Sequence, residues 1–221
     1  APLAREQWVR LYQLLKEICP VYLVDGMKQY PDMVFTANAG LPFHDTDRKF
    51  CVMSKMRDHQ REGEIRHFAK YLYSLGYEID YLQTNALFEG EGDVLWHPVW
   101  RVLIGGWGQR SEKEAYEEIS RRYRVPVILL ELVDPRFYHL DTAFLPLTPN
   151  DALYVPQAFH PRGRTLIEAA FSRAYGVSKQ EALAYACNGI RLGTNVIMPS
   201  EAPDAAQYAM GRGFMVETTP M

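Results

Sequence analysis

The sequence predicts an α/β protein. Short apolar segments, each the length of a buried strand, alternate along its 221 residues with amphipathic segments of helical period. The order strand, helix, strand, polar loop recurs, and this alternation is typical of α/β folds. No low-complexity linker divides the chain, so we expect one domain over residues 1–221.

The N-terminal half is predicted to begin with a helix over residues 4–18, which has an apolar stripe and is followed by Pro20. The stripe consists of Trp8, Leu11, Leu15 and Ile18. A second helix is predicted over residues 61–76, where Gly76 would form the C-terminal cap. Apolar runs predict strands over residues 21–25, 50–54, 77–82 and 100–106.

The C-terminal half contains two capping-box patterns, in which a Ser is followed three residues later by a Glu. They open predicted helices over residues 111–123 and 178–188 with the pairs Ser111–Glu114 and Ser178–Glu181. The remaining predicted elements are strands over residues 125–132, 194–199 and 214–218 and a short helix over residues 201–213.

Composition and charge exclude several classes of protein. The chain is 48% hydrophobic and 23% charged, which is ordinary for a globular protein, and its net charge of −3 gives no basic excess for nucleic acid. It contains no apolar run of the roughly 18 residues that a membrane span needs. Three cysteines without CxxC spacing (Cys19, Cys51 and Cys187) argue against disulfides or a zinc site, and favour a reducing cytoplasm. The oligomeric state stays open, a homo-oligomer included.

The first two polar loops carry acids beside glycines. In "YPDMVFTANAG", residues 30–40, Asp32 and Asn38 flank Phe35, and a turn capped by these side chains is one interpretation. In "LFEGEGDVLW", residues 87–96, the acids Glu89, Glu91 and Asp93 alternate with glycines. No phosphate loop or EF-hand pattern is present, so we expect a carboxylate at a strand edge, directed at a cation or a His, or else a solvated hairpin.

The other two loops offer a base and a cation. In "DPRFYHLDT", residues 134–142, strand geometry would direct His139 and Asp141 to one face, where a carboxylate can orient an imidazole. A buried structural His is the alternative. In "GGWGQRSEKEAY", residues 105–116, Arg110 precedes a predicted helix and would hold a carboxylate ligand. An acid-rich pocket with one base and one Arg suits a guanidino compound that also carries a carboxylate.

Four stretches resemble the guanidine-modifying enzyme superfamily, which includes arginine deiminase, dimethylarginine dimethylaminohydrolase, glycine amidinotransferase and arginine dihydrolase. They are "PDMVFTANAG", "FEGEGDVL", "GWGQRSEKEA" and "FYHLDTAF", in family order over almost the whole chain. The resemblance implies a five-bladed α/β propeller, the pentein fold, here without its C-terminal segment. It also implies covalent catalysis by a Cys thiolate, with neither metal nor organic cofactor.

The same resemblance implies roles for individual residues. His139 is similar to the general acid/base, and Glu89 to the acid that pairs with it and with the substrate, with Glu91 as the alternative. Asp141 would hold the guanidinium, and Phe35 would pack on its plane. Asp32 would receive the substrate's α-amino group. The carboxylate clamp would be formed by Arg110, with Arg57 or Arg61 as a second Arg.

Two departures from the family pattern decide the expected reaction. Asn38 replaces the Asp of the deiminases, which resembles the arginine dihydrolase branch that forms ornithine, ammonia and carbon dioxide. The family's nucleophilic Cys lies close to the C-terminus, and none of the three cysteines fits it. We therefore expect the nucleophile beyond residue 221. The alternatives are a deiminase or dimethylarginine hydrolase that forms citrulline, an amidinotransferase, and a non-catalytic guanidine-binding protein.

Overall fold

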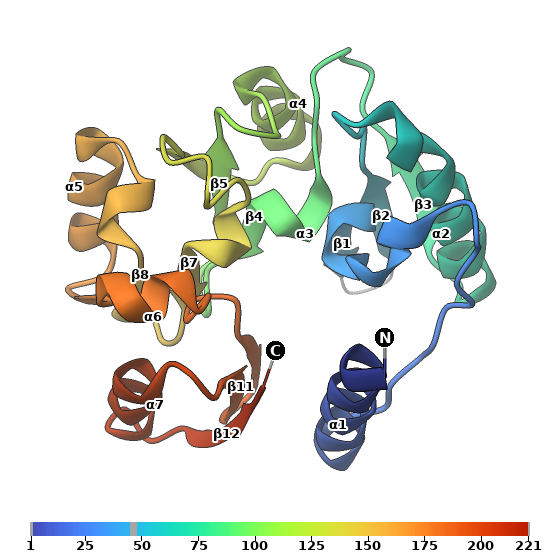
Figure 1. The fold of residues 1–221 in the computed structure, drawn as a ribbon. Helices are drawn as coiled ribbons and strands as arrows, with labels where there is room; N and C mark the ends of the chain where they lie inside the picture. Colours follow the sequence, from blue (N-terminus) through green and yellow to red (C-terminus); the bar gives the residue numbers. More distant parts are fainter. Residues whose placement is uncertain (1, 45–47, 221) are drawn as a thin grey trace. The chain divides into compact units, whose positions relative to one another are not determined.

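A computed structural model describes residues 2–44 and 48–220 (Figure 1). The chain divides into two compact units. One contains residues 24–140 and 158–163, and we call it the central unit. The other combines the N-terminal segment with residues 141–157 and the C-terminal segment from residue 164, and we call it the terminal unit.

The central unit contains two three-stranded sheets. The first consists of β1 (Gly40–His44), β2 (Lys49–Met53) and β3 (Glu78–Tyr81), and the second of β4 (Val94–Trp96), β5 (Leu103–Trp107) and β6 (Val127–Glu131). In each sheet the first two strands are antiparallel and the third is parallel to the second. A parallel return needs a crossover, which α2 (Glu62–Ser74) and α4 (Lys113–Tyr123) provide. In Figure 1, α2 lies against the first sheet.

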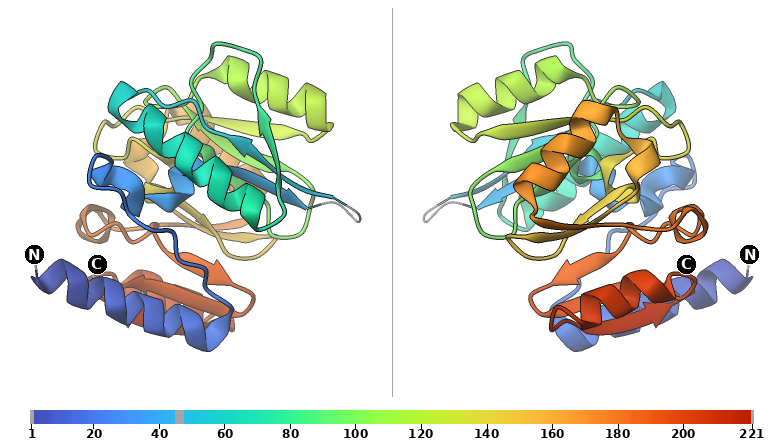
Figure 2. Two further views of the ribbon diagram at one scale, coloured as in Figure 1. Left: turned by 90° about the vertical axis from the view of Figure 1, so that its right-hand side faces the viewer. Right: turned by 90° about the vertical axis from the view of Figure 1, so that its left-hand side faces the viewer.

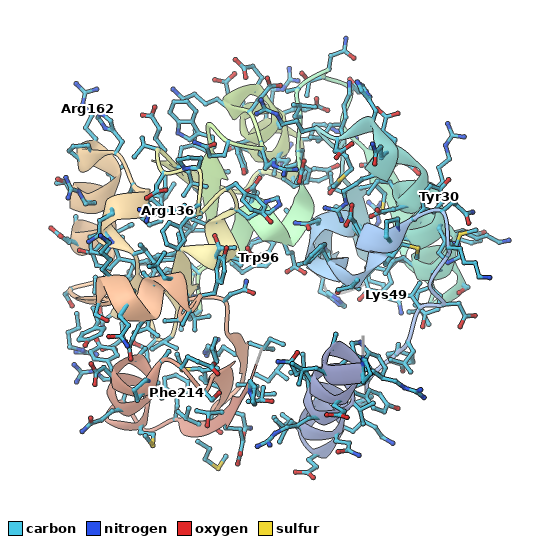
Figure 3. The ribbon with its side chains drawn as sticks, in the orientation of Figure 1. Tyr30, Lys49, Trp96, Arg136, Arg162 and Phe214 are labelled. Carbon is cyan, nitrogen blue, oxygen red and sulfur yellow. The ribbon has the colours of Figure 1, made fainter. Side chains whose placement is uncertain are left out.

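Apolar side chains join the two sheets of the central unit. Leu41 and Phe43 of β1 belong to the same buried cluster as Phe88 and Leu103. Trp96, labelled in Figure 3, reaches from β4 to β1, where its ring meets Phe43 edge-on at 5.2 Å. A second cluster, between α2 and the first sheet, includes Met53, Ile65 and Phe68. These clusters fix the loops at the ends of the strands.

The terminal unit repeats the same plan. Its sheets are β7 (Phe144–Pro146), β8 (Asp151–Tyr154) and β9 (Arg173–Gly176), then β10 (Ile190–Leu192), β11 (Asn195–Pro199) and β12 (Met215–Thr219). The helices are α1 (Pro2–Ile18), α6 (Lys179–Leu183), α7 (Pro203–Met210) and, from residue 164 onward, α5 (Pro161–Ala170). Figure 2 shows α1 beside β12, which it contacts. Ser178 caps α6 as predicted, because its hydroxyl accepts a hydrogen bond from the Glu181 N–H at 3.2 Å.

Two sequence predictions about elements are wrong. Residues 21–25 form no strand, since they pair with no neighbour and Tyr22 and Leu23 are exposed. Ser111 does not cap α4, whose first residue is Lys113 and whose N-cap position is held by Glu112 without a side-chain cap. The Ser111 hydroxyl instead donates a hydrogen bond to the buried carboxylate of Asp93. In residues 2–44 and 48–220, no helix combines the length and apolar character needed to cross a membrane.

Candidate active site

Three polar loops of the central unit meet where β2, β5 and β6 end at their carboxyl termini. The segment after β2 pairs with the 87–96 loop, because Lys55 and Phe88 exchange backbone hydrogen bonds of 2.8 and 3.0 Å. Ser111 follows β5, and His139 follows β6. Loops at the carboxyl ends of strands are the usual place for a site in α/β sheets, because the rigid sheet positions them.

The 87–96 loop contains a one-turn helix, α3 (Gly90–Asp93). A helix has 3.6 residues per turn, so Glu89 and Asp93, four apart, lie on one side of this turn. Both are fully buried, whereas Glu91 is half-buried on another side. The solvated hairpin considered from the sequence is therefore wrong. Burial of two carboxylates requires nearby donors.

Glycines allow this turn to pack tightly. Gly90 has a φ of +56°, and a Cβ there would lie 2.6 Å from the backbone N of Gly40. A Cβ on Gly92 would lie 2.0 Å from Nδ2 of Asn38. Both positions therefore need glycine for close approach, and Asn38 is packed directly against the turn that carries the two acids.

His139 lies between the two buried carboxylates. Its Nε2 is 3.3 Å from Oε2 of Glu89, and its Nδ1 is 3.2 Å from Oδ1 of Asp93. The residue is buried and lies in a bend just before a short 3₁₀ turn at Leu140–Thr142, not on the strand that the sequence predicted. Each ring nitrogen thus faces an acid, and the two contacts fix the orientation of the imidazole.

Asp93 is a candidate site residue to which the sequence interpretation gave no role. Its Oδ1 accepts a hydrogen bond from the Leu140 N–H at 3.1 Å, and its Oδ2 accepts from the N–H and hydroxyl of Ser111 at 3.1 and 2.6 Å. These contacts hold Asp93 and the chain next to His139 in place. The spacing of Asp93 four residues after Glu89 is the signal that could have identified it.

Glu89 uses its two oxygens differently. Oε1 accepts a hydrogen bond from the backbone N–H of Arg57 at 3.0 Å and lies 3.6 Å from Nη1 of Arg110. Oε2 faces His139 and, within residues 2–44 and 48–220, accepts no hydrogen bond of good geometry. Of the two acids considered from the sequence, Glu89 is the one whose carboxylate lies beside the ring of His139, at 3.3 Å. Glu91 instead lies near enough to Cys51 to help raise the pKa of that thiol.

Asn38 lies at the end of a pair of 3₁₀ turns, Pro31–Val34 and Thr36–Ala39, in place of the simple turn considered from the sequence. Its Nδ2 is 3.4 Å from Nε2 of His139, and its Oδ1 accepts a hydrogen bond from Nη1 of Arg61 at 3.2 Å. Arg61 is buried and pairs with buried Glu64 at 3.1 Å. Arg61 was expected to clamp a substrate carboxylate; its guanidinium here contacts protein groups.

The other predicted binding residues surround this cluster. The Asp32 carboxylate is half-buried and forms no hydrogen bond or ion pair with the described part of the chain. Phe35 is 52% exposed, with the Arg61 guanidinium 5.7 Å from its ring. Arg110 lies 4.8 Å from the Tyr138 ring, and the exposed Arg57 side chain donates to the Gln109 carbonyl.

Asp141 belongs to the terminal unit, where its backbone carbonyl accepts a hydrogen bond from Asn188 at 3.3 Å. Its predicted contact with a guanidinium stays a prediction.

The three cysteines are unpaired. Burial, and to a smaller extent the charge of Glu91, raises the pKa of Cys51 to about 12. Burial also raises the pKa of Cys187, with a contribution from Glu181. A nucleophilic thiol needs the opposite shift. In the ranges 2–44 and 48–220, no group of three His, Cys, Asp or Glu side chains is arranged to hold a metal ion.

Comparison with known proteins places the chain among guanidine-modifying enzymes, although no family model matches it. It is 38% identical over 220 residues to a bifunctional arginine dihydrolase/ornithine cyclodeaminase of Nostoc sp., covering 99% of this chain and 31% of that protein. The chain thus spans about a third of the length of this relative.

Two further relatives are covered more fully. A dimethylarginine dimethylaminohydrolase of Mycobacterium tuberculosis is 35% identical over 212 residues, which are 96% of this chain and 68% of that enzyme. The crystal structure of the N-terminal domain of ArgZ, a cyanobacterial arginine dihydrolase, bound to its product, matches with a TM-score of 0.91 and 35% identity, covering 97% of this chain and 78% of that one. The match confirms the predicted α/β pentein fold, and the chain belongs to the guanidine-modifying enzyme superfamily, in the group of the arginine dihydrolases and dimethylarginine dimethylaminohydrolases.

Proposed function

We propose that the protein hydrolyses the guanidino group of arginine to ornithine, ammonia and carbon dioxide. The observation that carries the proposal is the position of His139, buried between Glu89 and Asp93 with the Asn38 amide at its Nε2. A base held by two acids suits proton transfer to and from a cationic substrate. The arginine dihydrolases of Nostoc and of the cyanobacterial ArgZ structure support the choice of reaction.

The charges of the site suit both ends of arginine. Oε2 of Glu89 is a buried acceptor directed at His139, so it can receive an N–H of the substrate guanidinium. Arg110, partly exposed, would hold the α-carboxylate. The Asp32 carboxylate would pair with the α-amino group. Asp141 and Phe35 keep their proposed roles on the guanidinium, and Arg57 its role as a second clamp.

Catalysis in this proposal proceeds through a thiolate. A Cys thiolate attacks the guanidinium carbon, and the C–N bond breaks as His139 protonates the departing ammonia. His139 then removes a proton from water, which displaces the thiolate and leaves a ureido group. A second round, with another water, releases ornithine, a second ammonia and carbon dioxide. Glu89 stabilises the cationic species, and Asp93 orients the imidazole.

We propose that the nucleophile comes from a part of the protein outside these 221 residues. Cys51 and Cys187 are buried and have raised pKa values. Cys19 directly follows α1 and belongs to the terminal unit, whereas His139 belongs to the central unit. The relatives contain residues that have no counterpart in this sequence. Three unpaired thiols fit a reducing compartment, so we also propose the cytoplasm.

The test is product analysis by mass spectrometry, with the natural full-length protein and arginine. Ornithine with two equivalents of ammonia is the expected result. Citrulline with one equivalent would overturn the dihydrolase proposal in favour of a deiminase, and binding without turnover would indicate a guanidine-binding protein. In the same assay Asn38→Asp should shift products toward citrulline, because a carboxylate cannot donate to the ureido oxygen as an amide does.

A second candidate is hydrolysis of methylated arginine, which the M. tuberculosis relative favours. Dimethylarginine would then give citrulline and dimethylamine. Competition between equal amounts of arginine and dimethylarginine separates the two proposals, because the ratio of the two product amounts gives the ratio of the kcat/KM values.

A further inference from the structure

We propose that the buried Arg61–Glu64 pair fixes the orientation of the Asn38 amide, and thereby decides which of its atoms faces the catalytic His139. The pair would act as positioning residues. The inference rests on the proposed function for its effect on products, whereas its structural part stands without it.

Every nitrogen of the Arg61 guanidinium has a protein partner. Nε donates to Glu64 Oε2 at 3.2 Å, and Nη2 donates to the same oxygen at 3.1 Å and to the Asp32 carbonyl at 3.2 Å. Nη1 donates to Asn38 Oδ1 at 3.2 Å. Arg61 is 6% exposed and Glu64 1%. A planar guanidinium held at Nε and Nη2 by one carboxylate has its Nη1 direction fixed as well.

An Arg can only donate, so it selects the oxygen of an amide. With Oδ1 bound to Arg61, Nδ2 is the amide atom directed to His139, 3.4 Å from Nε2. Because Nδ2 is a donor, it disfavours a proton on Nε2 of His139, and so it opposes the Glu89 carboxylate, whose Oε2 lies 3.3 Å from the same nitrogen and favours one. A reversed amide would present Oδ1 and favour a proton on Nε2.

The amide is also confined from the other side. A Cβ on Gly92 would lie 2.0 Å from Nδ2 of Asn38 and 3.3 Å from Nδ1 of His139. Asn38 therefore lies against the backbone of α3, and it cannot move away from Arg61 without displacing this turn. The packing against Gly92 limits the position of the amide, and the hydrogen bond from Arg61 selects which of its atoms is the oxygen.

The orientation matters most in the second hydrolysis. The ureido intermediate has an oxygen, an acceptor, where the guanidinium has an N–H donor. An Asn38 held with its NH₂ group toward the site can donate to that oxygen. Loss of the orientation should therefore slow the second round more than the first, and citrulline should accumulate.

The structural test is ¹⁵N NMR of the His139 ring in the full-length protein, with the double variant Arg61→Met/Glu64→Gln, which leaves no buried charge unpaired. The expected result is a shift of the tautomer toward a protonated Nε2. In a protein that already contains Asn38→Ala, the same double change should cause no further shift of the tautomer. This double-mutant cycle isolates the effect that Arg61 and Glu64 exert through Asn38. An equal shift in both backgrounds would overturn the inference.

The functional test measures the ornithine-to-citrulline ratio. The double variant should lower it roughly tenfold, the size expected for one hydrogen bond to a charged group, and Arg61→Lys should restore part of it. With a decarboxylated guanidino substrate, the ratio of the diamine to the ureido amine should fall by the same factor. A loss confined to the KM for arginine, absent with that substrate, would make Arg61 a carboxylate clamp and overturn the inference. Arg66→Met, an exposed Arg on α2, is the matched control.

If the unaltered protein does not turn arginine over, the proposed function fails while the NMR result still decides the orientation of Asn38.

Discussion

Two buried carboxylate clusters in this protein differ in what remains for a ligand. Asp151, 1% exposed at the start of β8, pairs with Arg173 at 2.7 Å and Arg212 at 2.9 Å, and accepts hydrogen bonds from Thr148 and Tyr208. Both of its oxygens are occupied by protein donors. Arg173, the largest cause, lowers the pKa of Asp151 to about 2.

The cluster around His139 is equally buried but incompletely paired. Asp93 is saturated like Asp151, whereas Oε2 of Glu89 faces a titratable ring. Burial of an acid therefore does not mark a site. A site is indicated by an acceptor that the surrounding protein holds in place without filling, since such a group costs free energy that a ligand can recover.

The largest expected effect is at the titratable ring. His139→Gln should lower the turnover of the full-length protein by roughly 10²- to 10⁴-fold, the usual contribution of a general acid/base. Arginine binding, measured by calorimetry, should persist. His44→Gln, which alters an exposed His beside Tyr77, is the control and should keep full activity. A His139 variant as active as this control would remove the assigned role.

A smaller loss is expected from crowding the site without changing its charges. Gly92→Ala would place a Cβ 2.0 Å from Nδ2 of Asn38, and the displaced amide should cost roughly 10²-fold in kcat, as misplacement by about 1 Å does. Gly26→Ala meets nothing within 4 Å and should be neutral. Steady-state kinetics with circular dichroism separates this effect from unfolding, and unchanged kcat in Gly92→Ala would contradict the described packing.

The saturated cluster should affect stability and not catalysis. The pKa of Asp151 is lower in the folded chain than the roughly 3.9 of an unfolded Asp. Ionised Asp151 therefore adds about 2 kcal/mol to the free energy of unfolding. This contribution is complete above about pH 4 and is lost as the pH falls toward 2. Urea unfolding of wild type and Asp151→Asn across this range should converge at low pH. A constant difference down to pH 2 would refute this assignment.

The smallest effect is expected at the buried thiols. Cys187→Ala should change turnover by less than about twofold, because burial raises the pKa of this thiol and keeps it protonated. Labelling with a thiol reagent should likewise spare Cys187 in the folded protein. Abolished activity in this variant would place the nucleophile inside the sequence and contradict the proposal that it comes from outside.

Much of the fold was predictable because its signals are local. Strands such as β5 and helices such as α2 are specified by the spacing of their own apolar residues. The role of Ser178 as a helix cap is indicated by Glu181, three residues later. The prediction is wrong at residues 21–25, which are apolar but pair with no strand in the described part of the chain.

The site was only partly predictable, since its contacts are non-local. Ser111 resembles a helix cap in sequence, but its hydroxyl serves Asp93, 18 residues earlier. Nδ1 of His139 faces Asp93, 46 residues earlier in the sequence, and Arg61 pairs with Glu64. A local pattern can identify which side chains carry chemistry, but a contact between distant segments decides what each one does.

The order of the four sheets along the chain has a consequence for biosynthesis. Each sheet is complete within one continuous stretch, and the stretches do not interleave: residues 40–81, 94–131, 144–176 and 190–219. Each can therefore form as the nascent chain leaves the ribosome, before the next is synthesised. Asn38, Glu89 and Asp93, which lie beside His139, all precede residue 141, so this part of the site can assemble cotranslationally while the rest of the polypeptide is still being made.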